Sequence, residues 1–468
     1  MTSRIPAIVV GGGVSGLVCA YALRKAGVEA LLVEASWRAG GVIRSERREG
    51  YLLELGPQSF SGTVALRKLC AELGIEEQFV EAPARAPRYV LVDGKLAAVA
   101  MSPPALLSSS LLGRGTKWNI ARDAFGRSQA PEEDESIASF VRRKFGAEVL
   151  DRLAGPFVSG VYAGDPERLS LRSAFPQLHE AEKAAGSVIR GMIGAATNRK
   201  GSRERPTLLS FREGNETLVR ALAAKIGSGL RLNAEVATIA VARDSAGGKF
   251  EVRVRATGGE GTLLAAQLVL ATATDVAGRL LKEVNAELGR LLGEIEYAPV
   301  AVVSLGYRRA DVGHSLGGFG FLVPRSSGLR VLGTVWNSSL FSGRAPEGFV
   351  LLTSFVGGAT DPAAVMLSNE SLAALVHGEI QPLLKVSAAP AFVNVQIYRR
   401  ALPQYNLGHG ARLAAMEKLR SEVGNLFFVG NYLRGPAIGS CVEQALGIAE
   451  EIAAAATVPR IRFSGFAV

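Results

Sequence analysis

Residues 5–16 read IPAIVVGGGVSG, a short apolar run followed at once by a G-x-G-x-x-G motif. The apolar run has the length of one buried parallel strand. Residues 17–27 then show helical spacing and end in a capping glycine, and residues 28–34 form a second apolar run that ends in Glu34. This order of strand, glycine turn, helix, strand and acid is the context in which the motif predicts dinucleotide binding.

Each glycine of the motif meets a separate physical requirement. Gly11 permits the tight turn, Gly13 lets the backbone approach a pyrophosphate, and Gly16 lets the helix pack closely on the sheet. The N-terminus of the helix faces the phosphate charge. Glu34 follows Gly16 by 18 residues and can accept hydrogen bonds from a ribose. We therefore expect a Rossmann-like domain at the start of the chain.

The composition excludes several other classes of protein. The 468 residues carry a formal net charge of +10, and 48% of them are hydrophobic, which is too apolar for a disordered chain. No apolar run reaches the length of a membrane span and the first residues lack the order of a signal peptide, so we expect a cytoplasmic protein. Cys19, Cys70 and Cys441 lie far apart, which excludes zinc-ribbon and dithiol motifs. We expect no metal, and no nucleic acid because no basic stretch is interleaved with aromatic residues.

The segment after Glu34 distinguishes FAD from NAD. Arg38 precedes a second glycine pair at 40–41, and residues 54–59 read ELGPQS. Both segments resemble the extended motif of the FAD-binding amine oxidase superfamily, in which the second turn runs beneath the isoalloxazine. The resemblance implies FAD as the cofactor. Gln58 stands where many relatives have Asn, so its contact with the substrate or the flavin stays open.

In these flavoproteins, segments late in the chain complete the nucleotide-binding domain. Later parts of this chain resemble those segments. Residues 229–236 and 265–273 look like strands of that domain, the first of them meeting the adenine. Residues 425–446 read as a strand, a glycine turn and a helix whose N-terminus would place partial positive charge near the flavin N1 and C2 carbonyl. The residues that we expect to hold FAD are Gly11, Gly12, Gly13, Val14, Ser15, Gly16, Glu34, Ala35, Arg38, Gly41, Val42, Gly56, Pro57, Gln58, Ser59, Val236, Asn431, Pro436, Ala437 and Ile438.

The middle of the chain resembles one family in particular, the oxygen-dependent, FAD-containing protoporphyrinogen oxidases. The matching passages are residues 134–146, residues 155–176 with the run GVYAGDP, residues 318–324 and residues 403–409. The resemblance extends from about residue 5 to about residue 450. It is most specific at GVYAGDP, because the FAD motifs define only the superfamily.

The family substrate is a flexible, mostly apolar tetrapyrrole with propionate groups, so its pocket should be apolar and contain a cation. By resemblance, Arg88 holds a propionate through two hydrogen bonds, and the leucine and phenylalanine positions sandwich the macrocycle. Small residues would let the ring approach the backbone closely. The substrate-binding residues implied in this way are Arg88, Ala163, Gly164, Leu322, Leu332 and Phe355.

The resemblance also implies the chemistry. A hydride leaves a meso carbon of the porphyrinogen for flavin N5, and dioxygen takes up the electrons as hydrogen peroxide. Removal of six electrons requires three flavin cycles. We name no catalytic acid or base, because the sequence shows no Ser-His-Asp order, metal-ligand cluster or paired carboxylates. We expect a structural role for His409.

The predicted fold class is α/β and α+β, with a discontinuous Rossmann-like FAD-binding domain, an α+β substrate-binding domain and a helical membrane-associating domain. In the helical domain, basic side chains stand beside apolar residues and Trp118, a combination typical of a helix at a membrane surface. Solvated helices over a local core fit this pattern nearly as well. The predicted ranges are 1–83, 230–292 and 415–468 for the FAD-binding domain, 84–90, 165–229 and 293–414 for the substrate-binding domain, and 91–164 for the helical domain.

The function implied is oxidation of protoporphyrinogen IX to protoporphyrin IX in tetrapyrrole and haem synthesis. Oxidation of coproporphyrinogen III to coproporphyrin III is the nearest alternative. Wider alternatives are another flavin amine oxidase or desaturase, and a non-catalytic escort protein that keeps the FAD fold. The sequence leaves the oligomeric state open, a homodimer included, together with peripheral contact with a membrane.

Overall fold

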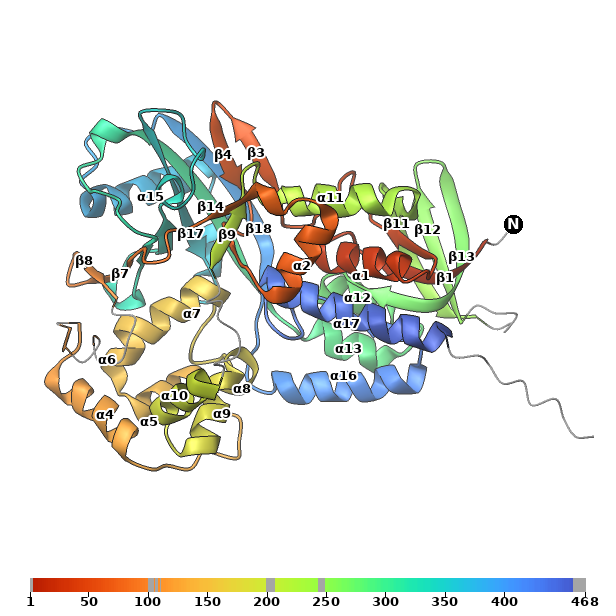
Figure 1. The fold of residues 1–468 in the computed structure, drawn as a ribbon, viewed down its shortest axis with the longest axis horizontal. Coiled ribbons are helices and arrows are strands. Elements are labelled where there is room, and N and C mark those ends of the chain that lie inside the picture. Colours follow the sequence, from red (N-terminus) through yellow and green to blue (C-terminus); the bar gives the residue numbers. More distant parts are fainter. Residues whose placement is uncertain are drawn as a thin grey trace, which may run out of the picture.

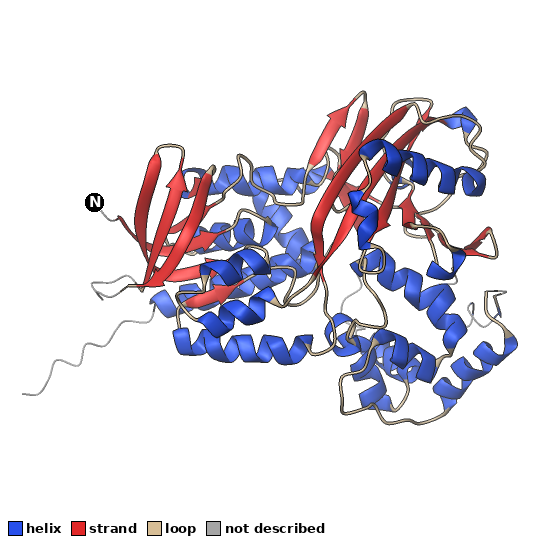
Figure 2. Ribbon diagram, turned by 180° about the vertical axis from the view of Figure 1, so that it is seen from behind, coloured by secondary structure: helices blue, strands red, loops and turns tan. Residues whose placement is uncertain are grey.

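The computed structural model describes residues 3–99, 105, 108–109, 111–198, 207–242 and 249–457. A basic loop that the sequence predicts at 197–206 lies mostly outside these residues. In the rest of the chain two large sheets dominate, and Figures 1 and 2 show them well apart, with helices between them. Parallel and antiparallel strands with helices on their faces confirm the predicted fold class.

The N-terminal motif builds the first sheet. β1 pairs in parallel with β2 and β13, and helix α1 (Val14–Lys25) makes the crossover between β1 and β2. The glycine turn therefore lies at the carboxyl end of β1, where doubly wound sheets bind their ligands. The strand order is β10 (Leu230–Arg231), β2 (Ala30–Val33), β1 (Ser3–Val10), β13 (Gly259–Leu270), β12 (Phe250–Ala256) and β11 (Ala234–Val241), with β19 (Leu426–Phe428) on β13.

Helices cover both faces of this sheet. Alternate residues of β1 point to opposite faces, so Val9 enters one core and Ile8 the other. On the Val9 side lie α1, α2 (Val64–Leu73), α11 (Glu216–Ile226) and α17 (Ile438–Thr457). On the Ile8 side lie α12 (Thr274–Leu280), α13 (Ala286–Gly293) and α16 (His409–Val423).

The second sheet is mostly antiparallel. Helix α15 (Asn369–Leu384) covers one face with Leu372, Val376, Ile380 and Leu384, which recur every four residues. The opposite face carries a separate apolar cluster. The strand order is β18 (Phe392–Pro403), β14 (Tyr297–Arg308), β17 (Phe349–Gly357), β16 (Val331–Val335), β15 (Gly320–Leu322), β7 (Arg88–Val92) and β8 (Lys95–Ala98).

A group of helices lies beside the second sheet, away from the first (Figure 1). A buried ion cluster stabilises it, with Lys144 Nζ 2.6 Å from Asp123 Oδ1 and 3.1 Å from Glu182 Oε1. None of the helices described in this chain is long and apolar enough to cross a membrane. The helices are α4 (Arg114–Phe125), α5 (Ile137–Lys144), α6 (Ala147–Val149), α7 (Gly155–Tyr162), α8 (Leu171–Ala174), α9 (Pro176–Ala185) and α10 (Val188–Asn198).

Small sheets join the parts of the fold. β3 (Ser45–Arg48) pairs with β4 (Tyr51–Glu54), and β9 (Leu208–Phe211) pairs with both β5 (Phe60–Ser61) and β6 (Phe79–Glu81). β9 and α11 belong to the range predicted for substrate binding, yet they pack with strands and helices of the first 83 residues. The three-part division of the chain stays a prediction.

Candidate functional site

The glycine turn after β1 leaves room for a ligand at one position. Gly11 has φ +106°, and a Cβ there would lie 2.9 Å from the backbone of Ala271. A Cβ at Gly16 would collide with the carbonyl oxygen of Gly11. Gly13 differs, because its φ is −67° and no atom of the described residues lies within 4 Å of a Cβ built there. The backbone therefore borders open space at Gly13, where the sequence places a pyrophosphate, and the turn fits a dinucleotide.

Glu34 is held in position by two backbone amides. Gly12 N donates to Oε2 at 2.6 Å, and Ser36 N donates to Oε1 at 2.8 Å. Each oxygen keeps acceptor capacity for a ribose hydroxyl. The amide of Ala234 at the start of β11 donates to the Glu34 carbonyl, so Val236, the predicted adenine neighbour, follows two residues later on the same strand.

Arg38 shapes the second glycine loop. Its guanidinium donates to the carbonyls of Ala39, Gly41 and Ile43 at 2.8, 3.1 and 2.9 Å. Gly40 N donates to Gly12 O at 2.7 Å, which fixes the second loop against the first. The two predicted phosphate-facing segments are thus adjacent.

The turn at residues 54–59 lies against the same loop. A Cβ at Gly56 would collide with the carbonyl oxygen of Val42. The Gln58 side chain is buried and donates from Nε2 to the carbonyls of Glu54 and Gly56, both at 2.9 Å. Its Oε1 accepts from Asn337 Nδ2 at 2.6 Å. The side chain of Gln58 therefore holds the turn in its conformation. Pro57 and Ser59, its neighbours in the chain, are fixed in place with it.

The predicted C-terminal segment joins this site from the other end of the chain. Burial raises the pKa of the Cys441 thiol, and the nearby side chain of Ser15 opposes this shift. The first turns of α1 and α17 are therefore adjacent, and both helices pack in one core. A Cβ at Gly439 would lie 2.7 Å from Thr63 Cγ2, just beyond the 54–59 turn. Asn431 and residues 436–438 lead into this end of α17. The structure thus brings together the residues predicted to hold FAD from distant parts of the chain.

Three of the predicted substrate-binding residues lie on the face of the second sheet that α15 does not cover. Leu322, Gly333 and Phe355 are direct neighbours on β15, β16 and β17. The register shifts between Val331 and Gly333, and this irregularity lets Leu332 join Phe355 in one apolar cluster. Ala163 and residues of β14 and β18 also belong to this cluster.

Small residues let helix α7 approach this face. A Cβ at Gly160 would lie 2.6 Å from Leu322 Cδ2, and one at Gly164 would lie 2.9 Å from Gln404 Oε1. Ala163 ends α7 in the left-handed region at φ +47°, and its carbonyl accepts from Ala359 N at 2.7 Å. The helix end is therefore fastened to the loop after β17.

Arg88 lies at the edge of the apolar face. It begins β7, is exposed, and holds its guanidinium 5.4 Å from the centre of the Phe319 ring. It pairs with Gly320 in the parallel register of β7 and β15, two positions before Leu322. In the part of the chain that the structure describes, no carboxylate pairs with it. Arg88 is therefore a cation available to a ligand.

Tyr398 connects the two halves of the site. Burial raises the pKa of its hydroxyl, and the positive charges of Arg38 and Arg44 oppose this shift, which places both arginines near it. Tyr398 packs with the apolar cluster on the second sheet. The apolar face and the second glycine loop therefore approach each other at Tyr398.

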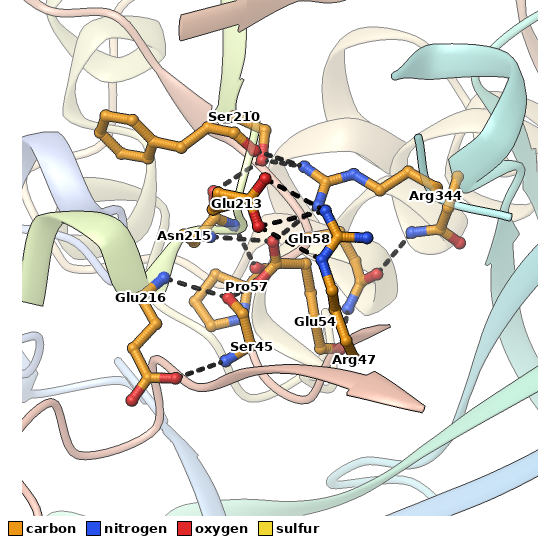
Figure 3. Close-up of polar contacts among 12 residues, drawn as sticks. Ser45, Arg47, Glu54, Pro57, Gln58, Ser210, Glu213, Asn215, Glu216 and Arg344 are labelled. Carbon is orange, nitrogen blue, oxygen red and sulfur yellow. Dashed lines mark hydrogen bonds and ion pairs between the residues drawn. The ribbon is translucent and has the colours of Figure 1, made fainter. Parts of the chain in front are cut away.

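A buried polar network lies behind the 54–59 turn (Figure 3). Glu54 Oε1 is 3.3 Å from Arg344 Nη1, and each side chain is only 2% exposed. Ser45 Oγ and Asn215 N donate to the Glu54 carboxylate at 2.6 and 2.9 Å, and Arg344 also donates to Ser210 Oγ. Burial raises the pKa of Glu54 to about 7 and lowers that of Arg344.

Sequence reasoning missed most of this network. Asn215 Nδ2 donates to the carbonyl of Pro57 at 2.7 Å, so the network holds the turn as well as the ion pair. Arg344 and Asn337 belong to no motif, and each meets its partner across a long stretch of chain. Only the folded structure shows that these two polar side chains are buried. Over the described residues, no group of three or more His, Cys, Asp or Glu side chains is placed to hold a metal ion.

Comparison with known proteins agrees with this geometry. Residues 14–454 match the family model "Flavin containing amine oxidoreductase". The chloroplastic protoporphyrinogen oxidase of Nicotiana tabacum is 33% identical over 96% of this chain and 86% of its own length. The coproporphyrinogen III oxidase of Bacillus subtilis is 29% identical over 93% of this chain and 95% of its own length. The crystal structure of a putative protoporphyrinogen oxidase from Exiguobacterium sp. 255-15 superposes with a TM-score of 0.80 at 24% identity, covering 97% of this chain and 99% of that one.

Proposed function

Because the chain belongs to the flavin-containing amine oxidoreductase family, we propose that it oxidises protoporphyrinogen IX to protoporphyrin IX with dioxygen as the electron acceptor. The observation that carries this proposal is the apolar face of Leu322, Leu332 and Phe355, with Arg88 at its edge, which approaches the second glycine loop. A tetrapyrrole with propionates has the shape and charge for such a site.

Family membership confirms three expectations from the sequence. The chain is an enzyme, it uses FAD, and its resemblance to the protoporphyrinogen oxidases extends over nearly the whole chain. That protoporphyrinogen IX is the substrate and dioxygen the electron acceptor is our proposal. The Bacillus subtilis relative supports coproporphyrinogen III as the second candidate substrate.

The residues of the chain bind and orient the reactants. FAD, when bound, supplies the hydride acceptor at N5. The apolar face excludes water from one side of the macrocycle, and Arg88 fixes its orientation through a propionate. Conversion of the porphyrinogen removes six hydrogens, so three dioxygen molecules are reduced to three hydrogen peroxide molecules. We assign no side chain as acid or base.

The proposal is tested by mixing the FAD-loaded protein in air with protoporphyrinogen IX, coproporphyrinogen III or an amine, while porphyrin fluorescence and peroxide are followed. We expect protoporphyrin above the autoxidation rate and three peroxides per porphyrin. Faster turnover of coproporphyrinogen would favour the second candidate, and peroxide from the amine alone would favour an amine oxidase. Porphyrin formation no faster than autoxidation with both porphyrinogens would overturn the proposal.

Replacing Arg88 by alanine should raise the KM for the porphyrinogen about tenfold, because a charge-assisted pair with a propionate is lost. The FAD content should not change, since Arg88 lies on the second sheet. Lys95→Ala removes the same charge at the far end of the β7–β8 hairpin and serves as the control. An Arg88→Ala enzyme with the KM of the control would contradict the assigned role.

We also propose that helix α4 lies on an anionic membrane surface and that the protein works there from the cytoplasm. Trp118 and Phe125 are 71% and 88% exposed and share one helical face with Arg114 and Arg122. Aromatic and basic side chains on one face suit the headgroup region.

Replacing Trp118 and Phe125 by serine should lower cosedimentation with phosphatidylglycerol vesicles about tenfold, because their apolar surface no longer enters the bilayer. The control is Met366→Ser, which removes a 68% exposed apolar side chain elsewhere. Equal sedimentation of the double variant and the control would exclude α4 as the contact.

A further inference from the structure

Two stacked aromatic rings hold the turn that leads into α17. Tyr405 follows β18, and His409 begins α16. Their rings are inclined by only 6°, with centroids 4.4 Å apart, and each residue is 1% exposed. The pair therefore forms a rigid block between the end of the second sheet and a helix of the first.

Each ring contacts the backbone of the turn at residues 431–435. The Tyr405 hydroxyl donates to Asn431 O and accepts from Gly435 N at 2.7 Å. His409 Nε2 lies 3.0 Å from Tyr432 O. A carbonyl oxygen only accepts, so the imidazole proton is on Nε2, and Nδ1 finds no hydrogen-bond partner among the described residues. Burial lowers the pKa of His409 to about 4, so the ring is neutral at pH 7.

The position of this turn determines where α17 begins. Gly435 has φ +123°, a conformation that glycine adopts without strain, and the helix starts three residues later. The amides of its first turn have no acceptor within the helix and carry partial positive charge. Ser15 and Cys441 place this helix end beside the N-terminus of α1, inside the predicted FAD site. The field at the cofactor therefore depends on how firmly residues 431–435 are held.

We propose that Tyr405, supported by His409, is a positioning residue that fixes the turn at 431–435 and thereby sets the reduction potential of the bound FAD. Negative charge develops on the flavin when it is reduced, and a fixed helix N-terminus stabilises that charge. The proposal depends on FAD and not on which porphyrinogen is oxidised, so it can fail while the proposed function holds.

The test is Tyr405→Phe, which keeps the ring stack and removes both hydrogen bonds. We expect a more negative midpoint potential of the bound flavin, measured by equilibration with reference dyes. Amide exchange over residues 432–438 should be about tenfold faster, with and without FAD. The control is Tyr307→Phe. The Tyr307 ring also stacks on a histidine, His377, and its hydroxyl lies 2.9 Å from His377 Nδ1, but this pair joins β14 to α15, away from the turn at 431–435. Both of its readouts should match the wild type.

A midpoint potential of Tyr405→Phe equal to that of the control would overturn the proposal. Faster exchange without a change of potential would also overturn it, because the turn would then not act on the flavin. A variant that retains no FAD is judged on amide exchange of the flavin-free protein, where unchanged exchange over residues 432–438 is the contradicting result.

Discussion

Replacing Arg344 by methionine is expected to lower the free energy of unfolding by about 3–5 kcal/mol, because the change leaves Glu54 as a buried carboxylate without its cation. Glu54 and Arg344 are each 2% exposed, so water cannot replace the lost partner without opening the fold. The measurement is urea denaturation of the FAD-loaded protein at pH 8.

Two further measurements separate this effect from a loss of packing. Glu54→Leu in the Arg344→Met background should restore part of the stability, since it removes the unpaired charge. Burial raises the pKa of folded Glu54 from an ordinary 4.5 to about 7, although the positive charge of Arg344 lowers it. Without Arg344 the pKa of Glu54 should therefore rise further. The folded state therefore binds more protons than the unfolded state above pH 4.5, and the deficit of Arg344→Met should shrink at pH 5.5.

The matched control is Arg142→Met, which removes a guanidinium that pairs with Glu167 in solvent. Both side chains are about half exposed, so water screens the pair and we expect almost no change in the free energy of unfolding. An Arg344→Met protein as stable as this control at pH 8 would show that the Glu54 network contributes little to the fold.

Replacing Gly13 by valine is expected to weaken FAD binding about 10- to 100-fold while the flavin-free protein keeps its stability. Gly13 has φ −67° and no atom in the described part of the chain lies within 4 Å of a Cβ there, so the protein itself accommodates the side chain. The added atoms would occupy the space that the sequence predicts for the pyrophosphate, and a steric cost of about 1–3 kcal/mol would fall on the ligand alone. Fluorescence titration of the flavin-free protein with FAD measures the dissociation constant.

The control for this prediction is Gly378→Val on α15, where a Cβ also meets no atom within 4 Å. Its FAD affinity should equal that of the wild type. Urea denaturation of both flavin-free variants checks the fold. Wild-type FAD affinity in Gly13→Val would place the pyrophosphate elsewhere and contradict the assignment of residues 11–16.

Much of the cofactor site could be predicted from sequence because its parts are short, contiguous segments. The turn at 11–16 needs glycine at fixed spacing, and Glu34 ends the next strand at a fixed distance, so both can be recognised without knowing the fold. The short apolar run at residues 5–10 likewise predicts a buried strand. The individual FAD and substrate contacts remain predictions.

The sequence by itself determined the fold class and the FAD-dependent family. Only the tertiary structure showed that Leu332 shares a face with Phe355, because the shift of register in β16 is not encoded in strand alternation. It alone paired Glu54 with Arg344 and Gln58 with Asn337, across 290 and 279 positions of the chain. Local sequence patterns report which backbone conformation a segment adopts, whereas buried polar pairs depend on which distant segments the fold places in contact.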